Sequence, residues 1–326
     1  MKEYCASAHA LRWLTGIFLA VATAASAQSY PVKPVKIMVP FAAGGVADIT
    51  ARVLAQKMTE NLGQQVLVEN RPSAGGILAS EAVAKADPDG YTLLLISNGN
   101  AVSATLFKSL PYDTLSAFAP VSTAGFFDLV LLVDSTSKIA SVKDVLQYAR
   151  SNPGKLNIGT INIGSTQNLA AELFKSMAAI DAQVVPYKGT PAVITALRGK
   201  DVQVAVEILA PVLSQIRGGA LRPLALTSNR RFAGLPQVPT VAESGIPGYQ
   251  ASSWNGIAAP AKTPKAIIDK LNREVNAAVA APDVKRRLED LGVDARAGTP
   301  DELHRLLVSE IAKWRAVIER ANIPKQ

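Results

Sequence analysis

Apolar positions along the chain fall into short runs typical of strands and longer runs with helical spacing. The β-branched run Val35–Val39 predicts a strand, and the glycine loop Pro40–Gly45 ends it. Helical spacing begins at Ala47 and stops at Gly63. The same order then repeats, with strands expected at 65–69 and 91–96 and a helix that opens at 74–76. This β-α-β-α-β order predicts a parallel sheet with right-handed crossovers.

The pattern restarts farther along the chain and predicts a second α/β unit. The chain is expected to pass from the first unit to the second near Asp128 and to return near Ser252. Its strands are expected at 129–133, 156–160, 182–186, 202–206 and 222–227, and its helices at 142–150, 167–177, 192–198 and 209–217.

The last part of the chain is helical, with helices expected at 264–280 and 283–291. A capping box at Thr299–Glu302 opens a further helix, whose apolar stripe from Leu303 to Ile318 reads as core. These helices need a sheet to cover, and the first unit has only two helices of its own before the crossing. We therefore expect the chain to return to it, giving domain 1 at 28–127 and 254–326, domain 2 at 128–253, and a ligand cleft between two lobes joined by two crossovers.

The N-terminus has the pattern of a secretory signal peptide at residues 1–27. Lys2 and Arg12 supply positive charge, an apolar core follows, and Ala25–Ala27 is a small-residue cleavage site. The alternative is a membrane anchor, but the second half of the uncharged stretch is small and polar, whereas a spanning helix needs about 20 mostly apolar residues. An exported chain of about 300 residues, enough for two domains, fits a bacterial periplasm.

Composition excludes several classes of function. Cys5 is the only cysteine and His9 one of two histidines, so cleavage of the leader leaves no cysteine and only His304. A disulfide framework, a thiol nucleophile and a multi-histidine metal site are then excluded, and we expect no metal, no cofactor and no catalytic set. The net charge of +8 is spread without a basic stripe that carries aromatics, so no nucleic-acid partner is expected.

The first candidate site is the loop made by Phe41, Ala42, Ala43, Gly44 and Gly45. Loops that follow parallel strands lie at the sheet edge where ligands bind, and glycines would let backbone N–H groups point outward. The following helix N-terminus adds about half a positive charge, so the loop suits an anion, although a tight turn without a ligand gives the same pattern. Asp48 reads as a first-turn group that holds the loop, with ligand contact as the second reading.

A second loop of the same construction comes from the second unit, at 160–166, and includes Asn162 and Gly164. It resembles a nucleotide-binding P-loop without the lysine, so nucleotide hydrolysis is not expected. Ser165 and Thr166 are either N-caps or hydroxyl donors to a ligand. Neither loop contains Lys or Arg, so two helix N-termini facing each other would clamp an anion with backbone groups, hydroxyls and water.

Other polar side chains follow predicted strands at the same edge. Ser97 and Asn98 offer a hydroxyl and an amide, and Tyr187 comes directly after a strand. Glu207 also follows a strand, and it contacts a ligand donor, braces a loop or faces solvent. Trp254 at the second crossing reads as core or hinge packing, with a pocket wall as the alternative.

An ordered series of motifs covers nearly all of the mature chain. It includes YPVKPVKIMVPFAAGGVADITAR, VENRPSAGG, DPDGYTLLL, NIGSTQNLAAELF, VPYKGTPAVITAL and the closing EIAKW. The series resembles the substrate-binding receptors of tripartite tricarboxylate transporters, the Bug (TctC-like) family. The resemblance implies an α/β, two-domain periplasmic binding protein-like fold of type II that closes over a small carboxylate. It also implies delivery to a permease with one large and one small membrane subunit.

In that family the ligand carboxylate is held chiefly by backbone groups and waters of two loops, which here are Phe41–Asp48 and Asn162–Asn168. Many members carry His where this chain has Asn168 and Asp where it has Glu207, and both differences lie where they could change which carboxylate is selected. We expect a monomeric periplasmic receptor without enzymatic activity. The rivals are a carboxylate sensor, an enzyme acting on such acids, and a phosphate or sulfate receptor.

Overall fold

The computed structural model describes residues 30–326. The predicted signal peptide at 1–27 lies outside these residues. Within residues 30–326, no helix has both the length and the apolar character needed to cross a membrane.

The first part of the chain forms parallel strands connected by helices, as predicted. β1 lies between β2 and β3 and is parallel to both. The helix α4 was not predicted, because its first turn is polar; Ser97 caps it in a capping box with Asn100. The elements are β1 (Val35–Val39), α2 (Val46–Leu62), β2 (Val66–Asn70), η1 (Ala74–Gly76), α3 (Ile77–Ala84), β3 (Thr92–Ser97) and α4 (Asn98–Leu106).

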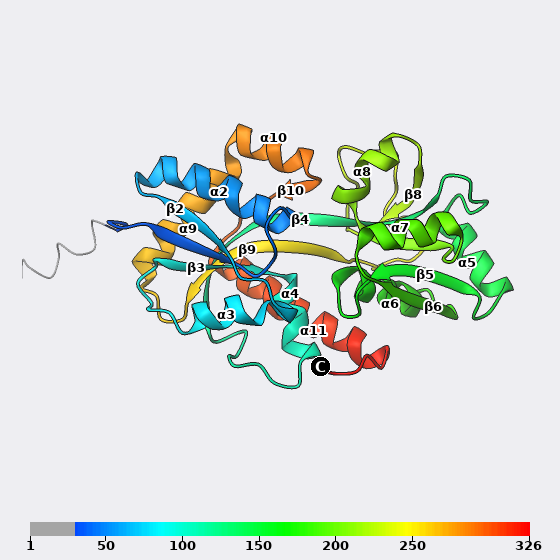
Figure 1. Ribbon diagram of the computed structural model, residues 1–326, viewed down its shortest axis with the longest axis horizontal. Helices are drawn as coiled ribbons and strands as arrows, with labels where there is room; N and C mark the ends of the chain where they lie inside the picture. The colour runs from blue at the N-terminus through cyan, green and yellow to red at the C-terminus, as the bar shows by residue number, and fades with distance from the viewer. Residues whose placement is uncertain (1–29) are drawn as a thin grey trace, which may run out of the picture.

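Two long strands that the sequence did not reveal run between the two halves of the molecule (Figure 1). The strand β4 (Phe118–Asp134) was expected only at 129–133, and β9 (Ser252–Pro260) was not expected. β4 pairs antiparallel with β9 as far as Asp128, and with β7 and β8 from Leu129 or Val130 onward. The sheet, in the order β2-β1-β3-β9-β4-β7-β5-β6, is therefore mixed: the predicted parallel arrangement holds for β1, β2 and β3, and the antiparallel strands β4 and β9 join it to the second half.

The second half contains a parallel core of its own, in which β5 pairs with both β6 and β7. β7 extends to Ile208, so Glu207 lies inside this strand and not after it, which corrects the predicted boundary. The elements are α5 (Val142–Ser151), β5 (Leu156–Ile161), α6 (Thr166–Met177), β6 (Ala182–Tyr187), α7 (Thr190–Gly199), β7 (Val204–Ile208), α8 (Leu209–Arg217) and β8 (Leu221–Leu226).

The C-terminal helices return to the first half, as predicted. The helices α9 and α10 pack with α2 against β1 and β3, burying Leu54, Leu95 and Leu271 in one core. The helix α11 packs on α4 and β4 with Trp314 fully buried, and its predicted capping box between Thr299 and Glu302 is confirmed. The elements are α9 (Lys265–Ala280), α10 (Pro282–Asp290), β10 (Val293–Ala295) and α11 (Pro300–Arg320).

We use "first lobe" for residues 30–127 and 254–326 and "second lobe" for 128–253, and this division stays a prediction. Trp254 is 1% exposed within the main core, which confirms core packing. His304 is exposed on α11, as expected for a residue without a partner motif.

Candidate functional site

The first glycine loop connects β1 to α2 and is exposed from Phe41 to Gly45. Gly44 has a φ of +84°, a left-handed backbone conformation that favours glycine, and Gly45 is the extended N-cap of α2. Among the residues that the structure describes, no side chain caps α2. The first N–H groups of α2 have no partner within their own helix, so they can meet an anion.

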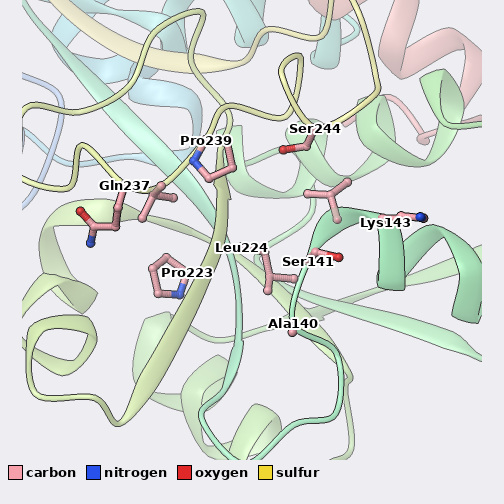
Figure 2. Close-up of a pocket in the computed structure, with 10 residues that line it drawn as sticks. Ala140, Ser141, Lys143, Pro223, Leu224, Gln237, Pro239 and Ser244 are labelled. Atoms are coloured by element: carbon pink, nitrogen blue, oxygen red, sulfur yellow. The ribbon is translucent and has the colours of Figure 1, made fainter.

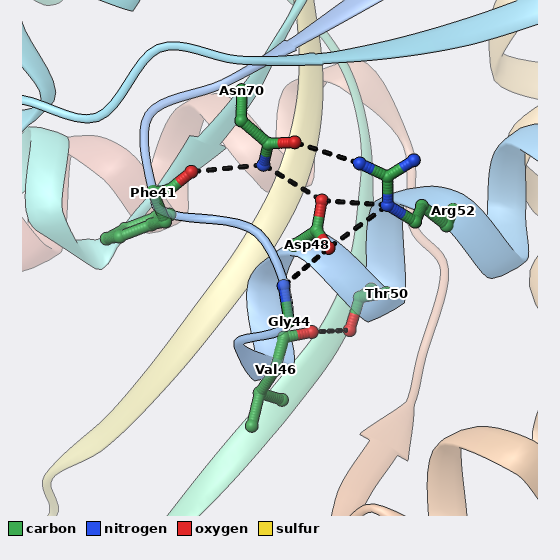
Figure 3. Close-up of polar contacts among 7 residues, drawn as sticks. All are labelled: Phe41, Gly44, Val46, Asp48, Thr50, Arg52 and Asn70. Atoms are coloured by element: carbon green, nitrogen blue, oxygen red, sulfur yellow. Dashed lines mark hydrogen bonds and ion pairs between the residues drawn. The ribbon is translucent and has the colours of Figure 1, made fainter.

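Asp48 ties this loop to the helix (Figure 3). Its carboxylate accepts hydrogen bonds from the Gly44 N–H at 2.8 Å, from Arg52 Nε at 3.0 Å and from Asn70 Nδ2 at 2.8 Å. Burial alone would raise the pKa of Asp48, but these bonds outweigh it and hold the pKa below its usual value. The predicted role of Asp48 in holding the loop is confirmed, and ligand contact by this side chain stays a prediction.

Arg52 and Asn70 complete the cluster and were not predicted. Asn70, at the end of β2, donates to the Phe41 carbonyl at 3.0 Å and accepts from Arg52 Nη2 at 2.9 Å. The spacing of four residues between Asp48 and Arg52 on one helix was a signal for this pair. Because Arg52 is bound to Asp48 and Asn70, it fixes the loop through other protein groups.

Substitution of Asp48 by alanine is expected to lower the free energy of unfolding by about 1–3 kcal/mol, because the Gly44 N–H and two side chains lose a buried acceptor. Urea denaturation measures this change. The matched control is Asp269→Ala, which also removes a pair four residues apart, with Lys265 at 2.6 Å, but at 42% side-chain exposure. This control should cost less than about 1 kcal/mol, and equal losses in the two variants would contradict the bracing role of Asp48.

The second glycine loop connects β5 to α6. Gly164 has a φ of +78°, and Ser165 caps α6 by accepting a hydrogen bond from the Asn168 N–H at 3.1 Å. Of the two readings for Ser165, the N-cap is therefore confirmed. Asn168 is buried, accepts from the Gly164 N–H at 3.1 Å and donates to Thr160 Oγ1 at 3.3 Å.

The two loops share one hydrogen-bonding arrangement. In each, a glycine with positive φ donates its N–H to a buried side chain four residues later, at the third position of the helix, which is Asp48 in one loop and Asn168 in the other. The expectation that glycine N–H groups point outward is therefore wrong for Gly44 and Gly164. The side chain at the third position of each helix accepts the hydrogen bond from the glycine N–H. The N–H groups of the first helical turn therefore remain as the candidates for ligand contact.

The first turn of α4 lies between the two loops. A Cβ placed on Gly99 would be 3.8 Å from Phe41 of the first loop, and Asn98 Nδ2 donates to Thr166 Oγ1 of the second at 2.9 Å. A Cβ on Gly164 would overlap Leu106 of α4. The structure thus places the first turn of α4 beside the first turn of α6 and beside Phe41 of the loop that precedes α2, and the sequence predicted the two loops but not α4.

Ser97 and Asn98 are both engaged by protein groups. The Ser97 hydroxyl is buried and accepts from the Gly99 N–H at 3.2 Å. Asn98 is fully buried, and its Oδ1 accepts from the indole Nε1 of Trp314 at 2.7 Å. Ligand contact by these two side chains stays a prediction.

Glu207 lies at the same edge and is fully buried, so the solvent-facing reading is wrong. Its Oε2 accepts from Thr190 Oγ1 at 2.9 Å and Gln167 Nε2 at 3.5 Å, two contacts that were not predicted. Its Oε1 has no hydrogen-bond partner among the described residues. Burial raises the pKa of Glu207 to about 7. Tyr187 is half-buried opposite Ile161, beside the second loop.

Two cavities of about 500 Å³ lie away from these loops. One is in the second lobe, between the start of α5 and the segment after β8, where Lys143, Pro223 and Pro239 line it (Figure 2). The other lies between α6 and α11, at the place where Arg320 Nη1 donates to Ser176 Oγ at 2.7 Å. Together with the bond between Asn98 and Thr166, this contact holds the lobes against each other.

Comparison with known proteins places the chain in a family. Residues 50–323 match the model described as tripartite tricarboxylate transporter family receptor. Protein BugT of Bordetella pertussis is 37% identical over 308 residues, which cover 93% of this chain and 94% of BugT. A protein of Pseudomonas sp. (strain P51), described as a UPF0065 protein in the tcbD-tcbE intergenic region, is 36% identical, with 94% and 93% of the two chains covered.

Solved structures agree with this assignment. The R. palustris protein Rpa4515 with adipate has a TM-score of 0.78 and 33% identity, covering 90% of this chain and 99% of its own. MatC from Rhodopseudomonas palustris with bound malate has a TM-score of 0.74 and 32% identity, covering 89% and 100%. The periplasmic binding protein BugD has a TM-score of 0.75 and 31% identity, covering 91% and 100%. The predicted fold class, an α/β two-lobed periplasmic binding protein, is confirmed, and the chain belongs to the family of tripartite tricarboxylate transporter receptors.

Proposed function

We propose that this protein is a periplasmic receptor that captures a small organic carboxylate and delivers it to a tripartite membrane transporter with one large and one small permease subunit. The observation that carries the proposal is that two glycine loops without Lys or Arg, each leading into a helix N-terminus, both contact α4, in a fold whose relatives were solved with adipate and malate. The predicted signal peptide supports export to the periplasm.

The acid is held without an ion pair in this proposal. First-turn N–H groups of α2, the hydroxyl of Thr166 and bridging waters meet its carboxylate, since neither loop contains Lys or Arg. Each charge-assisted hydrogen bond contributes about 1.5–3 kcal/mol, so about four to six of them, less ordering costs, reach micromolar affinity. The ligand-binding residues we propose are Phe41, Ala42, Ala43, Gly44, Gly45, Asp48, Ser97, Asn98, Asn162, Gly164, Ser165, Thr166, Asn168, Tyr187 and Glu207.

Binding without chemistry is the whole task of such a receptor. Ligand favours the closed state by its difference in affinity for the open and closed conformations. The contacts between α4, α6 and α11 across the lobes are those that closure would form or tighten.

A thermal-shift screen of the mature protein with adipate, malate, other dicarboxylates, tricarboxylates, aromatic acids, phosphate and sulfate tests the proposal. An acid at about 100 times its dissociation constant should stabilise the protein by about 2.7 kcal/mol. Stabilisation by phosphate or sulfate alone would contradict a carboxylate receptor. Delivery is tested separately, by uptake of the radiolabelled acid into membrane vesicles that carry both permease subunits, with and without the receptor.

A further inference from the structure

Asn98 is a fully buried amide that links both lobes. It is the first residue of α4 in the first lobe, and its Oδ1 accepts from Trp314 Nε1 of α11 at 2.7 Å. Its Nδ2 donates to Thr166 Oγ1, the first residue of α6 in the second lobe, at 2.9 Å. Three side chains far apart in the sequence thus form one chain of hydrogen bonds that ends beside the second glycine loop.

The direction of this chain follows from the chemistry of its first member. An indole N–H donates and cannot accept, so the Asn98 oxygen has to face Trp314. The amide nitrogen of Asn98 then has to face Thr166 and donate to it. A hydroxyl has one hydrogen, and since Thr166 Oγ1 accepts from Asn98, that hydrogen points elsewhere.

The hydroxyl hydrogen of Thr166 is available to a ligand. Thr166 is only partly buried and follows the second glycine loop, in which Asn162 and Ile163 are exposed. Among residues 30–326, its hydroxyl makes no hydrogen bond as a donor. A carboxylate is an acceptor only, and a partly buried hydroxyl whose hydrogen points away from Asn98 can donate to it.

We propose that Trp314 and Asn98 are positioning residues that commit the Thr166 hydroxyl to donate a hydrogen bond to the carboxylate of the ligand. This inference rests on the proposed function and extends it to the recognition of the carboxylate, because the hydroxyl hydrogen, which cannot point at Asn98, is left to bond an acceptor atom of the ligand. We call the hydrogen-bonded series Trp314, Asn98 and Thr166 the relay. It needs both lobes in contact, so it acts in the closed state.

Asn98→Asp is the sharpest test. An aspartate has nearly the same shape and still accepts from Trp314, but it presents an acceptor to Thr166 and takes the hydroxyl hydrogen away from the ligand. We expect the affinity for adipate or malate, measured by calorimetry on the mature protein, to fall about 10- to 100-fold. Thr166→Val should give a comparable loss, and Thr166→Ser, which keeps the hydroxyl, should bind within about threefold of the parent.

Trp314→Phe removes the donor that orients the relay, and Trp254→Phe is its matched control. Trp254 is equally buried, but its Nε1 has no hydrogen-bond partner among the described residues. We expect about a tenfold loss of affinity in Trp314→Phe and little change in Trp254→Phe. Urea unfolding of each variant separates lost binding from lost folding.

A double-mutant cycle separates the relay from a general structural role. If Trp314 acts through Thr166, Trp314→Phe should cost no further affinity in a Thr166→Val background. Equal losses in both backgrounds, or Thr166→Val binding as tightly as the parent, would overturn the relay while leaving the proposed function in place. A parent protein that binds none of the acids in the screen would overturn both.

Discussion

Gly164→Val is expected to weaken carboxylate binding on the order of 100-fold while the protein still folds. Two effects act at this position. The φ of +78° is unfavourable for a residue with a Cβ by about 1–2 kcal/mol, and the new side chain would overlap Leu106 across the lobe boundary. The buried Leu106 side chain would have to move, and together with the strained turn this shifts the second loop and the first-turn groups of α6 away from the ligand.

Gly219→Val is the matched control for the backbone strain alone. Gly219 has a φ of +71°, and a Cβ built there meets no atom within 4 Å among the described residues. It should lower the unfolding midpoint less than Gly164→Val, because the overlap with a neighbouring side chain is absent, and leave the affinity for the acid unchanged. Gly44→Val should also abolish ligand-induced stabilisation, because its φ of +84° sets the path of the first loop. Parent-like thermal shifts in both Gly44→Val and Gly164→Val would show that the proposed pocket is wrong.

Glu207→Gln is expected to remove a large pH dependence of stability. Burial raises the pKa of Glu207 to about 7 from an ordinary value of 4.5, so the folded protein holds a proton that the unfolded chain has lost between these values. The free energy of unfolding should therefore fall as pH rises from about 4.5 through 7. The stabilisation is fully present below 4.5, and its loss is on the order of 3 kcal/mol.

Denaturation with urea between pH 4 and pH 8 measures this slope. Glutamine is uncharged throughout and keeps an acceptor for Thr190, so the variant should be the more stable protein at pH 8. The control Glu243→Gln removes a carboxyl whose pKa lies below its usual value, because it accepts from the Thr240 N–H, so the slope above pH 5 should persist. A parental slope in Glu207→Gln would mean that Glu207 is not the group that causes it.

The periodicity of apolar residues predicted those strands and helices whose sequence pattern lies within a few consecutive residues. The strand at Val35–Val39 and the helix at Leu209–Arg217 have the predicted bounds, since each is a short apolar run or amphipathic stretch between clear breakers. The first part of β4 and the whole of β9 escaped prediction because they carry small and polar residues that pack between neighbouring strands and helices. Ser122, for example, is fully buried in β4 yet reads as a loop residue.

The candidate site shows the same limit. The order strand, glycine loop, helix was enough to find both loops, because that chemistry lies within a few consecutive residues. The partners that hold the loops come from distant positions, as with Asn70 on Asp48 and Trp314 on Asn98. A pairing across more than 200 residues, such as the second, depends on how α11 packs on α4, which no local pattern contains.

β4 has a consequence for how this molecule can be divided. Its first part belongs to one side of the sheet and its last part to the other, and β9 runs beside it across the junction. An excision at the lobe boundary would sever both strands and expose backbone groups that are paired in the intact sheet. Each half cut out alone is therefore expected to lose strand pairing that it has in the intact sheet, and gene fusions or transplants should carry the two together.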